Sequence, residues 1–178
     1  GNIARGDSLE EKISGFPRFL EGARYNAQWS GMPYAIYSRK QGSNDYADDI
    51  NVRSLMTNYL AGGSVICPGD SGLRVPIELS MAIHSDAGIA HDSTFIGTLG
   101  IYTTDFNEGK LSSGLSRLVS RDMCDVVMTQ VNEDLSRTYG KWKRRAMHDR
   151  NYSESREPNV PSMILEILSH QNFKDMKY

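Results

Sequence analysis

The sequence predicts an α/β fold built on a mostly parallel sheet. The first observation is the stretch from Pro76 to Gly88, in which residues 79–83 are almost all apolar and turn-forming residues stand on both sides. A short apolar run of this kind is typical of a strand buried on both faces, as in parallel sheets. The second observation is that such runs alternate with helical patterns along the chain, the strongest at 116–139.

Length, composition and charge set the first limits on function. The chain has 178 residues, 39% of them hydrophobic and 24% charged, and a formal net charge of -2. These values are those of an ordinary globular domain, so we expect a lead-in at 1–17 and one domain at 18–178. The charge gives no general attraction to nucleic acid, and no apolar run is long enough for a membrane helix, so neither partner is expected.

Periodicity and turn residues predict the order of the elements. A helix is expected over 18–30, where Leu20, Ala23 and Ala27 share a face, and a second over 49–60, ended by Gly62 and Gly63. The apolar faces and turns predict the remaining elements, which are strands over 32–38, 79–84, 94–103 and 160–169 and a helix over 116–139. No element is predicted to close the fold after residue 169.

Two local features have plain structural interpretations. The string CPGDSG at 67–72 is similar to the nucleophile segment of trypsin-like proteases, but such enzymes need an upstream histidine, and none precedes it. A Pro-Gly-Asp turn is therefore predicted. Cys124 falls in a helical pattern and is expected in the core. A disulfide between Cys67 and Cys124 stays open, because spacing cannot establish it.

The segment 141–150 (KWKRRAMHDR) carries five lysine and arginine side chains. Such a run is usually a solvated face. The alternative is a contact with an anionic or carbohydrate ligand, with Trp142 as a platform for the ligand.

Two residues are candidates for chemistry. His84 stands at the end of a predicted strand, where α/β sheets bind their ligands. Glu166 interrupts an apolar strand, in which Met163, Leu165 and Ile167 point one way and Ile164, Glu166 and Leu168 point the other. Burial would raise the pKa of Glu166, as a general acid or base requires. The alternatives are a hydrogen-bonded structural histidine, and a glutamate that is solvated on an edge strand or paired with an arginine.

Three motifs resemble those of one enzyme family. The string IHSDA at 83–87, the helix RSLMTN at 53–58 and the strand VPSMILEILS at 160–169 resemble, in the same order, motifs of zinc-dependent N-acetylmuramoyl-L-alanine amidases of the Amidase_3 type. Together they cover most of residues 50–170. The local sequence of the chain most resembles that of a branch of large secreted Bacteroidetes-type proteins, sometimes labelled xanthan lyase.

The resemblance implies a three-layer α/β fold of the zinc-exopeptidase kind, with helices on both faces of a twisted, mostly parallel sheet. It implies a zinc ion held by His, Glu and His, and a glutamate that activates water to cleave the amide between N-acetylmuramic acid and L-alanine in peptidoglycan. By position, His84 matches a histidine ligand and Glu166 the catalytic glutamate. Glu21 matches the glutamate ligand by order alone. The resemblance also implies a secreted or periplasmic location.

The chain departs from the family at the first histidine ligand, because no histidine precedes His84. His91 could replace that ligand only if its loop folds back. The resemblance therefore predicts an incomplete core, truncated at both ends and neighbouring a β-sandwich domain, with weak zinc binding. The amidase hypothesis requires His84 and Glu166 to converge on one face of the sheet. The alternatives are a non-catalytic module that binds cell wall or polysaccharide, and a polysaccharide-degrading enzyme.

Overall fold

The chain forms two compact units, which are divided between Ile77 and Glu78. The structure is a computed structural model, and it describes residues 15–86, 88 and 94–178. Within the described residues, no helix combines the length and the apolar character that crossing a bilayer requires.

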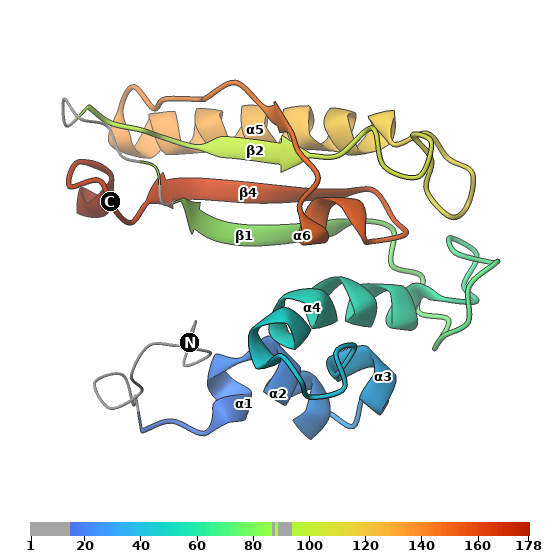
Figure 1. The fold of residues 1–178 in the computed structure, drawn as a ribbon. Helices are drawn as coiled ribbons and strands as arrows, with labels where there is room; N and C mark the ends of the chain where they lie inside the picture. The colour runs from blue at the N-terminus through green and yellow to red at the C-terminus, as the bar shows by residue number, and fades with distance from the viewer. Residues whose placement is uncertain (1–14, 87, 89–93) are drawn as a thin grey trace. The chain divides into compact units, whose positions relative to one another are not determined.

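The first unit is helical, and two sequence predictions for it are wrong (Figure 1). The helix expected over 18–30 is two helices, α1 (Arg18–Glu21) and α2 (Ala23–Trp29), because Gly22 between them is extended at φ -123° and ψ 131°. The strand expected over 32–38 is a single helical turn, α3 (Tyr34–Tyr37), which follows Pro33. Proline suits the start of a helix because its fixed φ is already helical and it has no N–H to satisfy.

The helix predicted over 49–60 is α4 (Asp45–Ala61), which begins one turn earlier than expected. Its N-cap is Asn44, whose side chain accepts a hydrogen bond from the amide of Ala47 at 2.9 Å. Asp48 is fully buried and accepts bonds from the Ser38 hydroxyl and the Lys40 amide. A buried carboxylate thus ties the loop before α4 to the helix.

The second unit contains a four-stranded sheet with the order β1-β4-β2-β3. Its strands are β1 (Ser80–Asp86), β2 (Leu99–Tyr102), β3 (His148–Asp149) and β4 (Ser162–Ser169). The pairs β1–β4 and β2–β3 are parallel, and β2–β4 is antiparallel. The predicted α/β class and the mostly parallel sheet are therefore confirmed. β1, however, is an edge strand with a half-exposed pattern, so the prediction of burial on both faces is wrong.

The long helix α5 (Leu118–Tyr139) covers one face of this sheet, as Figure 1 shows. The helix predicted over 116–139 is confirmed, and Cys124 is fully buried in its core, as expected. Cys124 and Met128 of α5 pack against Met163 and Leu165 of β4. The approach of α5 to β2 requires glycine at position 100, because a Cβ there would overlap the Cys124 sulfur.

The opposite face of the sheet carries a smaller apolar cluster and a short helix. Leu99, Ile101 and Ile164 form the cluster. The helix is α6 (Ser153–Arg156), a single turn that packs on β4. Helices therefore lie on both faces, as predicted, although the second layer within this unit is only one turn long.

A short helix follows the last strand, where the sequence predicted no further element. A 3-10 helix, η2 (Asp175–Lys177), follows β4. The buried carboxylate of Asp175 accepts hydrogen bonds from the amides of Ile96, Gly97 and Ser169 at 2.7, 3.2 and 3.0 Å. A single side chain thus joins the chain segment before β2 to the end of β4.

Candidate functional site

The pairing of β1 with β4 brings His84 and Glu166 together. The two strands run parallel, and His84 lies directly opposite Glu166 in the register. Opposed residues on neighbouring strands point to the same face, so both side chains lie on the face that carries α6. The Nδ1 atom of His84 is 3.9 Å from Oε1 of Glu166. The register is interrupted between His84 and Asp86, which marks the irregular end of β1.

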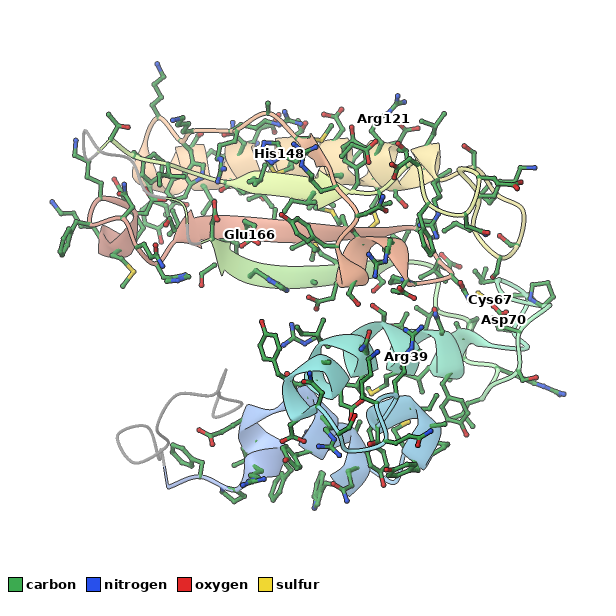
Figure 2. All side chains as sticks on the ribbon, viewed as in Figure 1. Arg39, Cys67, Asp70, Arg121, His148 and Glu166 are labelled. Atoms are coloured by element: carbon green, nitrogen blue, oxygen red, sulfur yellow. The ribbon has the colours of Figure 1, made fainter. Side chains whose placement is uncertain are left out.

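Glu166 is a largely buried carboxylate on the central strand of the described sheet. It is labelled in Figure 2, and its side chain is only 14% exposed. Its Oε2 atom is buried and has no hydrogen-bond partner among the residues that the structure describes. Burial raises the pKa of the Glu166 carboxyl, and the charges of Asp86 and Glu154 act in the same direction, against His84 and Arg145. The solvated edge-strand alternative is thereby excluded.

A second carboxylate, Glu154 of α6, reaches the same histidine. Its Oε2 lies 2.9 Å from Nε2 of His84, and its side chain is 14% exposed. The sequence pattern does not single out Glu154, because the surrounding string SESREPN is polar and has no apolar periodicity. The only signal was a glutamate shortly before the apolar strand. His84 therefore lies between two carboxylates, one at each ring nitrogen.

Asp86 and Arg145 form an ion pair next to this group. Arg145 Nη1 contacts Asp86 Oδ2 at 2.5 Å, and both side chains are 22% exposed. Asp86 raises the pKa of Glu166 and Arg145 lowers it, so the two charges of the pair act in opposite directions, and burial is the largest cause of the raised pKa. Arg145 thus connects the predicted basic run to the electrostatics of Glu166.

Two further cations of the basic run make contacts inside the second unit. Arg144 pairs with Asp125, and the Lys143 ammonium donates to the Phe95 carbonyl at 3.3 Å. Trp142 is only 6% exposed, and its Nε1 donates to the Thr98 hydroxyl at 2.8 Å. The alternative of a carbohydrate platform at Trp142 is therefore wrong, because the ring is packed inside the second unit.

The other predicted ligands do not join His84 within its unit. Glu21 is the last residue of α1 and belongs to the first unit, whereas His84, Glu154 and Glu166 belong to the second. His91 lies outside the described residues. Both cysteines are buried and neither forms a disulfide; Cys67 lies in the first unit and Cys124 in the second.

The described residues do not make a complete zinc site. Across residues 15–86, 88 and 94–178, no three His, Cys, Asp or Glu side chains are grouped so that they could hold a metal ion. Two ligands of a tetrahedral zinc, each about 2.1 Å from the metal, lie about 3.4 Å apart. The 2.9 Å between His84 and Glu154 is shorter and matches an N–H···O hydrogen bond.

Comparisons with known proteins add a distant likeness. No family model matches the chain, and no curated protein is significantly similar to it. The solved structure of the N-acetylmuramoyl-L-alanine amidase from Clostridium difficile 630 is similar, with a TM-score of 0.49 and 13% sequence identity. The match covers 80% of this chain and 65% of that amidase, so the chain spans less than two thirds of its length.

Proposed function

We propose that the chain is part of a peptidoglycan hydrolase of the N-acetylmuramoyl-L-alanine amidase class, with Glu166 as its general base. The observation that supports this proposal is the buried Glu166 carboxylate, which faces His84 on one side of the sheet and has a raised pKa. A general base is most effective when its pKa lies nearer to neutrality than that of a solvated carboxylate. The three family-like motifs supply the substrate class.

The proposed chemistry begins with a water molecule held beside Glu166. The carboxylate takes a proton from this water as its oxygen attacks the carbonyl carbon of the amide between N-acetylmuramic acid and L-alanine. Glu166 then returns the proton to the nitrogen of L-alanine as the C–N bond breaks. Each proton transfer of this kind contributes about 10²–10⁴-fold to the rate.

Zinc belongs to the proposal as a metal that His84 would help to hold. The described group does not complete such a site, so no step above passes through the metal. A location in the cell envelope and a neighbouring β-sandwich domain are parts of the same proposal, and they rest on the resemblance alone.

The experiment is digestion of purified peptidoglycan by the full-length protein, followed by mass spectrometry of the products. Cleavage should release peptides with a free N-terminal L-alanine. Glu166→Gln should lower the rate at least 100-fold, because the amide cannot accept the proton. Glu78→Gln, at an exposed position just before β1, is the matched control and should keep the wild-type rate. A Glu166→Gln variant that is folded and fully active would contradict the proposal.

A second candidate is a non-catalytic module that binds cell wall. The contact between His84 and Glu154 favours it, because their 2.9 Å separation is that of a hydrogen bond and is shorter than the separation of two zinc ligands. Sedimentation of the protein with peptidoglycan, without release of peptides by the wild type, would support this candidate over the first. An increase in ultraviolet absorbance from unsaturated uronic acids would instead indicate a polysaccharide lyase.

A further inference from the structure

Glu154 contacts His84 in the geometry of a hydrogen bond rather than of a shared metal. The 2.9 Å from Nε2 to the carboxylate oxygen is the usual length of an N–H···O bond, and the Glu154 side chain is 86% shielded from solvent, since it is 14% exposed. A carboxylate oxygen is an acceptor and an imidazole N–H is a donor, so a hydrogen bond at this distance runs from Nε2–H of His84 to Glu154. The hydrogen bond at one ring nitrogen sets the role of the other.

The opposite nitrogen of the same ring faces Glu166. Nδ1 is 3.9 Å from the Glu166 oxygen, which is too long for a direct hydrogen bond. A water about 2.8 Å from both atoms would see them at an angle of about 90°. Such a water could form hydrogen bonds to both atoms and also contact a substrate. With its proton on Nε2, the neutral ring presents the Nδ1 lone pair to this position.

The helix that carries Glu154 is held in place by buried polar contacts. α6 has only four residues, so it has little stability of its own. The Ser155 hydroxyl lies 2.8 Å from that of Thr103, and Ser162 on β4 donates to the Ser155 carbonyl at 2.9 Å. Ser155, Thr103 and Ser162 are all fully buried. The backbone beside Glu154 is therefore fixed against both β2 and β4.

A buried arginine fixes the other end of the same turn. Arg117 is 2% exposed, and its Nη2 donates to the Arg156 carbonyl at 2.8 Å, while its Nε donates to the Lys110 carbonyl. Burying a guanidinium is costly, and burial lowers the pKa of Arg117. These contacts fix the position of the one-turn helix, so the Glu154 side chain is held next to His84.

We propose that Glu154 is a positioning residue for His84. It accepts the Nε2–H of His84, so that the Nδ1 lone pair faces the position between His84 and Glu166. This inference rests on the proposed function for its activity readout, but its structural statement stands on the distances alone. It places the carboxylate partner of His84 on α6, within the same unit, rather than at Glu21.

The direct test is the imidazole ring itself. In the ¹⁵N-labelled chain, a one-bond ¹H–¹⁵N correlation at low temperature should show a ring proton on Nε2 of His84, assigned by its loss in His84→Gln. Glu154→Ala should abolish this signal, because the proton then exchanges with water. Glu154→Gln should keep it, because the amide oxygen can still accept. Glu157→Ala, just after the same turn, is the matched control and should also keep it.

The second readout is turnover of peptidoglycan. Glu154→Ala should lower kcat about 10–100-fold and leave KM nearly unchanged, with partial recovery in Glu154→Gln. A His84 proton found on Nδ1, or a ring signal unaltered by Glu154→Ala, would overturn the inference even in an active enzyme. If the wild type cleaves no peptidoglycan, the proposed function fails, and the ring signal alone decides the role of Glu154.

Discussion

Replacing Glu166 with leucine should make the second unit more stable at neutral pH. The native side chain places a carboxylate among apolar neighbours of β4, and its Oε2 has no hydrogen-bond partner among the described residues. A buried acceptor without a partner costs about 1–3 kcal/mol. Leucine removes this cost and keeps the apolar stem. The lost attraction to His84, which is 30% exposed and 3.9 Å away, is worth about 0–1 kcal/mol.

The expected net gain is therefore about 1–2 kcal/mol in the free energy of unfolding, and it should depend on pH. Burial raises the pKa of Glu166, so the folded state binds this proton more tightly than the unfolded state. The stability that the wild type draws from this proton is complete below the unfolded pKa and is lost as the pH rises through the folded pKa. The advantage of Glu166→Leu is thus full at neutral pH and shrinks in acid.

Urea unfolding followed by tryptophan fluorescence measures this difference. Trp142 is 6% exposed in the second unit, whereas Trp29 is 68% exposed, so the signal reports mainly on the unit that contains Glu166. The exposed Glu78 supplies a control, because Glu78→Leu should change stability by no more than about 0.5 kcal/mol. A Glu166→Leu variant that is less stable than the wild type, or equally stable at every pH, would refute the reasoning.

Three further outcomes follow from the second unit. Gly100→Ala should lower the stability of the second unit by about 1–3 kcal/mol, because the new methyl group overlaps Cys124. Gly69→Ala should be neutral, because a methyl group there meets open space. Equal effects of the two changes would contradict the close approach of α5 to β2. Burial raises the pKa of the Cys124 thiol to about 11. Iodoacetamide at pH 8 should therefore modify Cys124 only after urea is added. Rapid labelling of the folded chain would show that the thiol is accessible. Asp175→Ala should lower the free energy of unfolding in urea by at least about 2 kcal/mol, because three amides lose their acceptor. Asp175→Asn should lower it by less. A neutral alanine variant would show that the amides find other partners.

Long periodic segments of the fold were predictable, and short ones were not. α5 follows a helical stripe over many turns, so its pattern alone identifies it. The apolar string at 34–37 has strand composition, but a strand needs a neighbouring strand to pair with, and in the structure this string forms the turn α3. The edge position of β1 could not be predicted from its sequence either, because the order of the strands is a property of the whole sheet.

The candidate site was predictable where a residue conflicts with its local pattern. Glu166 stands out because a carboxylate in an apolar strand is costly to bury. Glu154 does not stand out, because a glutamate in a polar segment is ordinary. Its place beside His84 comes from Ser155, Ser162 and Arg117, which hold α6 through contacts that no sequence periodicity records.

The position of β4 has a kinetic consequence. It is the last described strand in the chain, yet it lies between β1 and β2. During synthesis, β1 and β2 leave the ribosome before the strand with which both must pair, and β1 carries the exposed apolar residues Met81 and Ile83. Unpaired strands of this kind associate with other chains. The yield of folded protein is therefore set by a competition between the arrival of β4 and association, and slower, more dilute expression favours the folded chain.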